Sequence, residues 1–345
     1  MIPIRNIYYM LTYAFRVLNE QGYKKIATEE FSNVGDLCAA ILCKGVSIQL
    51  KRGLDGEYVE QEEMLSTLRG KINISESIKT QAILRKQMVC TYDDFSVNSY
   101  MNQIIKTTMI LLLKSDISKV RKKDLRKLLI FFDEVDTLDT HSINWSIRYN
   151  RNNQTYRMLV SICYLVIAGL LQTNTNGTTQ LMDFIDEQRM SRLYEKFLFE
   201  YFKKEFPQIS ISASQIPWVL YDDMSSMLPI MQSDIMLTYE KKILIIDAKY
   251  YSRTTQTFYD SHTLHSSNLY QIFAYVKNKD AQLKEEDYEV SGMLLYAKTD
   301  EMIQPDNTYQ MSGNEISVST LNLNCDFLDI TEQLDRIMMS NFFQQ

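Results

Sequence analysis

Glycine and proline are scarce in this 345-residue sequence, which contains 10 and 5 of them. Linkers between domains are usually rich in these residues, so their scarcity argues against a long flexible linker. The chain is nevertheless longer than most single domains. Together these observations predict two domains that directly adjoin each other.

Cysteine is also sparse, and the five copies form no CxxC pair and are odd in number. Disulfide frameworks and structural zinc sites usually require such pairs. His262 and His265 are separated by two residues, but no cysteine cluster accompanies them. We therefore expect reduced thiols in a cytosolic protein, and no zinc site at the two histidines.

An excess of basic residues is absent, because 37 Lys and Arg stand against 43 Asp and Glu, for a formal charge of −6. A protein that holds DNA by its phosphates alone usually carries a basic excess. The charge leaves two interpretations open. Either the chain does not bind DNA, or a partner supplies most of the electrostatic attraction.

Long hydrophobic runs are missing as well. The most apolar stretch, residues 158–171, is too short to cross a bilayer and contains Ser161 and Cys163. The first fifteen residues lack the basic start, apolar run and cleavage site of a signal peptide. The sequence therefore predicts a cytoplasmic protein without membrane segments.

Hydrophobic periodicity predicts a mixed α/β (α+β) protein in two parts. The polar run at residues 172–180 is the best boundary and predicts domains at 1–175 and 176–345. The first part is expected to contain helices at about 4–18, 34–50, 98–114 and 158–171, and a strand at 85–92. The second part is expected to contain a helix at 186–206, strands at 209–220, 229–239 and 242–250, a helix at 266–279 and a strand at 291–298.

Charged residues end the most apolar strand. Asp247 and Lys249 are two residues apart, so in a strand they point to the same face. Asp234 lies in the preceding strand, and a short hairpin would place it beside Asp247. Two carboxylates can hold Mg²⁺, which polarises a phosphate and activates water. Lys249 would steady that water or the developing charge, and the carbonyl of Ala248 is a further candidate ligand.

The D-x-K triplet by itself is explained more simply as an ion pair at the end of a strand. Three further observations favour a metal site for phosphodiester hydrolysis. The triplet ends a buried strand, a second aspartate lies one strand earlier, and the order of elements around them is helix, three strands, helix, strand.

This order resembles the core of the PD-(D/E)xK nucleases, which runs αβββαβ, although Ser233 replaces the proline of the motif. The resemblance implies that Asp234, Asp247 and Lys249 are catalytic and that the two aspartates bind Mg²⁺. In NLYQIFAY, Gln271 and Tyr275 resemble the Q-x-x-x-Y element of RecB-like members, which orients the substrate or the catalytic lysine. Glu195 on the preceding helix is the candidate for an additional metal ligand.

Several segments narrow the resemblance to the McrC family, the nuclease subunits of McrBC modified-cytosine restriction systems. The segments are PIRNIYYMLTYAF, KGVSIQLKRGLDGEY, LRGKI, ILIIDAKYY and HSSNLYQIFAY. The family implies an N-terminal half that docks on a ring of GTP-hydrolysing AAA+ subunits and stimulates their hydrolysis. It also implies a stalk that enters the ring, for which residues 51–74, together with neighbouring strands, are the candidate. Such a partner, which delivers the double-stranded DNA, would explain the acidic charge.

Three functions follow as hypotheses. The first is a Mg²⁺-dependent endonuclease subunit that is active with the ring. The second is an adaptor that activates the motor without cutting, and the third is a stand-alone RecB-like repair nuclease. The chain has no G-x-x-x-x-G-K-[ST] phosphate loop, so we do not expect it to hydrolyse nucleotides itself. Glu200 competes with Glu195 for the metal, and Arg253 is either a DNA or motor contact or a flexible surface residue.

Overall fold

The computed structural model describes residues 2–19, 23–149, 153–171, 187–222, 224–251, 254–258 and 261–343. It contains helices and sheets throughout, which confirms the predicted α/β class. Arg253 and the polar run at 172–180 lie outside the described residues.

The chain forms two compact units, one of Met1–Ala27 with Ile185–Gln345 and the other of Thr28–Phe184. This boundary lies close to the expected one at 175/176. The first 27 residues, however, pack with the C-terminal unit, whereas the sequence pattern assigned them to the N-terminal domain.

The first unit is built on a six-stranded sheet with the order β12-β13-β11-β8-β7-β4. Its strands are β4 (Ser210–Ser212), β7 (Ile235–Tyr239), β8 (Lys242–Lys249), β11 (Glu289–Ala297), β12 (Asn307–Met311) and β13 (Asn314–Leu321). Its helices are α1 (Ile4–Ala14), α7 (Glu187–Glu205), α8 (Ser266–Gln282) and α9 (Phe327–Met338). Strand β11 pairs in parallel with β8 and β13, and the other pairs in the sheet are antiparallel.

Two small hairpins accompany the sheet. They are β5 (Gln215–Ile216) with β6 (Met231–Gln232), and β9 (Thr255–Phe258) with β10 (Ser261–Leu264). The first hairpin corrects the expected strand at 209–220, because the chain leaves the sheet after three residues of β4. It also splits the expected strand at 229–239, so that Ser233 and Asp234 lie between β6 and β7.

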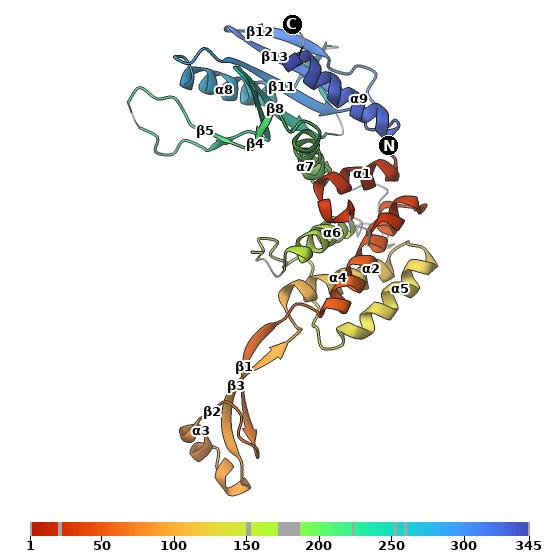
Figure 1. Ribbon diagram of the computed structural model, residues 1–345, viewed down its shortest axis with the longest axis vertical. Coiled ribbons are helices and arrows are strands. Elements are labelled where there is room, and N and C mark those ends of the chain that lie inside the picture. The colour runs from red at the N-terminus through yellow and green to blue at the C-terminus, as the bar shows by residue number, and fades with distance from the viewer. Residues whose placement is uncertain are drawn as a thin grey trace. The chain divides into compact units, whose positions relative to one another are not determined.

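Strand β8 is apolar from Ile243 to Ile246 because both faces of the sheet are covered there. Ile243 and Ile245 pack in one cluster with Ile272 and Val276 of α8. On the other face, Tyr194 of α7 reaches the carbonyl of Leu295 in β11. Figure 1 shows α8 lying along the sheet beside β8 and β11. The central strand is therefore fixed from both sides, and so are the side chains at its end.

The N-terminal helix joins this unit through specific contacts. The side-chain amide of Asn6 donates to the carbonyls of Leu323 and Cys325, at 2.9 and 2.8 Å. The ring of Tyr13 packs against Phe197 of α7 and Phe327 of α9, with centroids 5.7 and 6.0 Å apart. A helical pattern in the sequence predicts α1 but cannot show which sheet it packs near, because these partners lie far away in the chain.

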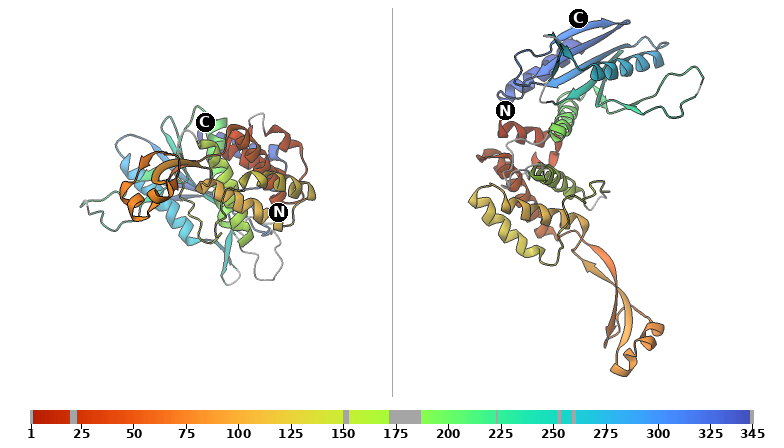
Figure 2. Two further views of the ribbon diagram at one scale, coloured as in Figure 1. Left: turned by 90° about the horizontal axis from the view of Figure 1, so that it is seen from below. Right: turned by 180° about the vertical axis from the view of Figure 1, so that it is seen from behind.

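The second unit is a group of helices from which a small sheet projects (Figures 1 and 2). The helices are α2 (Val34–Arg52), α4 (Tyr100–Lys114), α5 (Lys119–Leu129) and α6 (Gln154–Leu171). The projection contains β1 (Glu57–Leu65), β2 (Lys71–Ile72), α3 (Ile74–Lys79) and β3 (Met88–Ser96). Strand β3 lies between β1 and β2 and pairs with β1 along its whole length.

We call residues 54–97, the projecting sheet with α3, the stalk. The expected stalk at residues 51–74 begins slightly too early, because α2 continues to Arg52. The neighbouring strand that completes the stalk is β3, the long partner of β1. Short 3₁₀ turns, such as Ala82–Arg85 in the stalk, connect several elements.

No helix in the described ranges combines the length and the apolar character that crossing a bilayer requires. The five cysteines all lie in described segments, and none of them is joined in a disulfide. Burial raises the pKa of the Cys38 and Cys163 thiols to about 12, so neither is a reactive thiolate at neutral pH.

Gly292 marks the point at which α8 approaches β11 most closely. A Cβ atom there would lie 2.7 Å from Cγ2 of Val276 and 2.9 Å from Cγ1 of Ile272. We expect Gly292→Ala to lower the free energy of unfolding by about 1–3 kcal/mol, because neither buried neighbour can move aside freely. Denaturant unfolding measures this change. In the Gly292→Ala background, Val276→Ala should cost less than in the wild type, and additive effects would contradict the proposed clash.

Candidate active site

The hairpin of β7 and β8 places two aspartates side by side. Ile235 pairs with Ile246 in the antiparallel register, so Asp234 and Asp247 are the next positions along the two chains. Oδ2 of Asp234 accepts a 2.9 Å hydrogen bond from the backbone N–H of Ala248. This bond holds Asp234 against the end of β8, although Asp234 itself lies outside a regular strand.

Each of the two carboxyl groups shifts the pKa of the other. Burial raises the pKa of both carboxyls, and the negative charge of Asp234 adds to the shift at Asp247, which reaches about 7. The hydrogen bond from Ala248 opposes the shift at Asp234. Two carboxylates in one buried site repel each other, and a proton or a cation between them relieves the repulsion.

Lys249 supplies part of the compensating charge. Its Nζ lies 2.7 Å from Oδ2 of Asp247, whose side chain is only 2% exposed. Burial disfavours the ammonium form, but the charge and hydrogen bond of Asp247, together with the charges of Tyr251 and Asp234, outweigh burial and raise the pKa of Lys249. Among the described residues, Oδ2 of Asp247 receives no aligned hydrogen bond. This oxygen therefore keeps an unsatisfied lone pair in the centre of the site.

Residues of α8 hold Lys249 in place. Its ammonium donates a 3.1 Å hydrogen bond to Oε1 of Gln271, and Nε2 of Gln271 donates to the hydroxyl of Tyr275 at 2.9 Å. Tyr275 is buried in the core beneath the sheet. The spacing of four residues places Gln271 and Tyr275 on one face of α8. The structure thus brings this pair into the same network as Lys249.

A second network on the same helix was missed in the sequence. The hydroxyl of Tyr251 donates to Oδ1 of Asn268 at 3.3 Å, and Nδ2 of Asn268 donates to the hydroxyl of Tyr296 at 3.0 Å. Tyr251 lies two residues after Lys249, and Asn268 lies three residues before Gln271. Those spacings were the available signal, because they place each residue near a predicted site residue.

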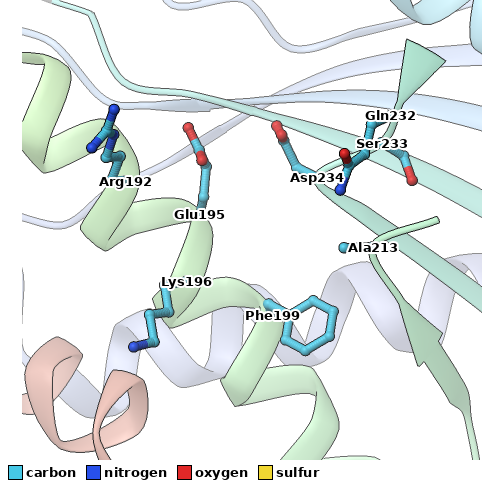
Figure 3. A pocket seen from close by; sticks show the side chains of 8 residues that line it. All are labelled: Arg192, Glu195, Lys196, Phe199, Ala213, Gln232, Ser233 and Asp234. Carbon is cyan, nitrogen blue, oxygen red and sulfur yellow. The ribbon is translucent and has the colours of Figure 1, made fainter. Parts of the chain in front are cut away.

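Glu195 approaches the pair from α7. It lines a pocket of about 490 Å³ together with Asp234, Ser233 and residues of α7 and β6 (Figure 3). Burial, followed by the charge of Asp234, raises the pKa of Glu195, and a 2.9 Å hydrogen bond from Ser191 opposes the shift. Glu200, the competing candidate, instead lies 3.6 Å from Arg16 and does not line this pocket.

The donor set fits a magnesium ion. Among the described residues, no three His, Cys, Asp or Glu side chains form a ready cage. Mg²⁺ does not require one, because proteins usually hold it by one or two carboxylates while water and phosphate complete its shell. Asp234 and Asp247 provide two carboxylates, and the buried Oδ2 of Asp247 is a ligand position next to the ammonium of Lys249, which lies 2.7 Å away.

Comparison with known proteins identifies the family. The model of the family described as "McrBC 5-methylcytosine restriction system component" matches residues 5–297, which cover most of the chain. The chain belongs to this family. The match extends over both units, and it includes Asp234, Asp247 and Lys249 as well as the stalk.

Two relatives show how far the likeness extends. The type IV methyl-directed restriction enzyme EcoKMcrBC of Escherichia coli K12 is 29% identical over 340 residues, which are 96% of each chain. A chain from a solved structure is similar in fold, with a TM-score of 0.54 and 16% identity over 98% of this chain and 76% of that one. That structure is a half-complex from a tetradecameric assembly of Thermococcus gammatolerans McrB AAA+ hexamers with bound McrC.

Proposed function

We propose that this chain is a Mg²⁺-dependent DNA endonuclease subunit of a restriction complex that acts on methylcytosine-containing DNA. The meeting of Asp234, Asp247 and Lys249 at the ends of two paired strands carries the proposal. The order α7, β4, β7, β8, α8, β11 supports a PD-(D/E)xK core, into which the two small hairpins are inserted.

The chemistry divides between the bound ion and the side chains. When bound, Mg²⁺ polarises the scissile phosphate and lowers the pKa of the attacking water. Asp234 and Asp247 hold the ion, and Glu195 faces Asp234 across the pocket as a further ligand (Figure 3). Lys249 places a positive charge beside Asp247, where it steadies the water and the charge that develops on the phosphate. Gln271 fixes the direction of the ammonium.

The partner in this proposal is a ring of AAA+ GTPase subunits. The structure of similar fold contains McrB AAA+ hexamers with bound McrC, and the net charge of −6 argues that this chain needs help to hold DNA. The stalk is the element that we assign to the ring. Its strand β1 is exposed almost throughout, and Tyr58 and Leu84 on the stalk are 75% and 80% exposed.

Reconstitution tests the proposal. The chain is combined with an AAA+ GTPase of the McrB type, GTP, Mg²⁺ and methylated duplex DNA, and cleavage is followed on gels. We expect cutting that needs all four components and stops when EDTA removes the metal. Stimulated GTP hydrolysis without cutting, at any Mg²⁺ concentration, would instead support an adaptor that activates the motor. Cutting by the chain without the ring would support a stand-alone nuclease.

The contacts of Gln271 make a smaller prediction. Gln271→Ala removes the acceptor that orients Lys249, so we expect the cleavage kcat to fall about 10–100-fold with little change in KM. Tyr275→Phe keeps the buried ring and removes the hydroxyl that Gln271 contacts, and it should give a smaller loss in the same direction. Quenched-flow cleavage assays measure both. If Tyr275→Phe lost more activity than Gln271→Ala, the order of this network would be wrong.

A further inference from the structure

The pocket beside Asp234 is larger than a metal site requires. Its volume of about 490 Å³ falls in the range of pockets that hold a small organic ligand. Carboxylates occupy one part of its wall, and Ser233 and Gln232 add polar groups. Phe199 and Ala213 add apolar surface, so the lining is mixed in the way that a sugar-phosphate chain requires.

Two cations line the same pocket from α7. Arg192 and Lys196 are four residues apart, so they lie on one side of the helix, about 6 Å apart along its axis. Glu195 lies between them in the sequence and points toward Asp234 (Figure 3). Along the helix axis, the two cations therefore lie on either side of Glu195. That separation is comparable to the distance between neighbouring phosphates of one DNA strand.

Each cation has an observation that ties it to the site. Arg192 is exposed, and its positive charge is close enough to Glu195 to lower the pKa of that carboxyl. Lys196 lines the pocket, and its Nζ lies 3.7 Å from the centre of the Phe15 ring, so its ammonium rests on an aromatic face. A cation held in this way loses less conformational entropy when it binds an anion.

We infer that Arg192 and Lys196 bind two neighbouring backbone phosphates of the cut strand beside the scissile bond, so that this strand runs along α7. This inference rests on the proposed nuclease function and adds the path of the strand to it. The chain as a whole is acidic, so its own hold on the DNA must come from local cations. Arg192 and Lys196 provide such a hold beside the carboxylates that bind the metal.

Salt dependence provides the test, because each phosphate contact releases counterions. The variants are Arg192→Ala and Lys196→Ala in the complete complex with the ring, GTP and Mg²⁺. The control is Lys241→Ala, which removes the same charge from the exposed turn at the other end of the β7–β8 hairpin. The measurement is the cleavage rate at limiting DNA over a tenfold range of salt, expressed as the ratio of wild type to variant.

We expect each variant to cut several-fold to tenfold more slowly at low salt. The ratio of wild-type to variant cleavage rate should then fall about eightfold over the tenfold rise in salt. The reason is that losing one phosphate contact changes the slope of log affinity against log salt by about 0.9. DNA contacts made by the ring are the same in both complexes, so they do not affect the ratio of the two cleavage rates. Arg192→Lys and Lys196→Arg keep the charge, so they should show the wild-type dependence of the cleavage rate on salt. Lys241→Ala should show the same dependence as the wild type.

Other outcomes would overturn the inference. If Arg192→Ala and Lys196→Ala cut more slowly by a factor that does not change with salt, their role is structural. If they behave as Lys241→Ala does, they are solvated surface residues. Tight binding of a free mononucleotide to the metal-loaded chain would identify a nucleotide pocket in place of a strand path. Failure of the wild-type complex to cut at all would instead refute the proposed function.

Discussion

Asp247→Asn is expected to abolish cleavage and to make the stability of the metal-free protein less dependent on pH between about 4 and 7. Asparagine keeps the shape of the side chain but removes the charge that would hold Mg²⁺, so the cleavage rate should fall by at least about a thousandfold, on the order of 4 kcal/mol in the activation barrier. Binding to the ring should be unchanged, because the substitution lies in the end of β8 and leaves the stalk intact.

The pH effect follows from the raised pKa of Asp247. The carboxyl titrates near 3.8 when unfolded and at about 7 in the metal-free fold. Between these values the folded state binds more protons than the unfolded state, so the wild-type free energy of unfolding falls as pH rises from about 4 to 7. The loss is on the order of a few kcal/mol, and Asp247→Asn should escape most of it.

Urea denaturation in EDTA at pH 5 and pH 8 measures this difference. The stability of Asp247→Asn relative to the wild type should rise between the two values. In the variant Lys249 loses its charged partner, which changes the free energy of unfolding at every pH. The test is therefore how the difference in free energy between the two proteins changes with pH, not its size at one pH. Adding Mg²⁺ at pH 8 should stabilise the wild type and leave the variant unchanged. An equal pH dependence in both proteins would mean that Asp247 is not the group that titrates.

Lys249→Ala is expected to lower kcat by roughly 10²–10³-fold, a magnitude typical of removing one group that stabilises transition-state charge. The loss has a second signature. The ammonium of Lys249 lowers the pKa of Asp247, so its removal should raise that pKa further. Asp247 then stays protonated up to a higher pH, so Mg²⁺ should bind only at a higher pH than in the wild type.

Isothermal titration of Mg²⁺ into the uncomplexed chain from pH 6 to pH 9 reads this shift without any cleavage. In Lys249→Ala the rise in metal affinity should occur at higher pH than in the wild type. Lys249→Arg retains the charge, so it should bind Mg²⁺ with a nearly normal pH profile even if it cuts poorly. Unchanged cutting by Lys249→Ala would show that the residue has no role in catalysis. An unchanged pH dependence of Mg²⁺ affinity would show that Lys249 does not affect the pKa of Asp247.

The central part of the site could be predicted because its residues are close in the sequence. The hairpin of β7 and β8 has a short turn, so its register follows from two apolar strands and brings Asp234 to Asp247. Gln271 and Tyr275 were predicted instead from the resemblance to the Q-x-x-x-Y element, because no pattern in the strands shows which residues of the following helix contact Lys249.

Other features depended on contacts between distant segments. The position of α1 is set by Asn6 and Tyr13, whose partners lie near the other end of the chain. The cations Arg192 and Lys196 resemble any charges on a helix surface until the pocket places them beside Asp234. The short β4 was predicted as a long strand because its apolar residues continue into the β5–β6 hairpin. Periodicity does not distinguish a strand that stays in a sheet from one that leaves it.

The packing of α1 has a consequence for how the protein is made and how it can be divided. The unit that carries the aspartates is assembled from both ends of the chain, so Thr28–Phe184 is an insertion within it. During synthesis the inserted unit can fold first, while α1 waits for α7 and α9 to emerge. A fragment that begins at residue 176 would leave the rings of Phe197 and Phe327 uncovered and prone to aggregation. A chain that joins residues 1–27 to 185–345 through a short linker is therefore the natural form of the isolated catalytic unit.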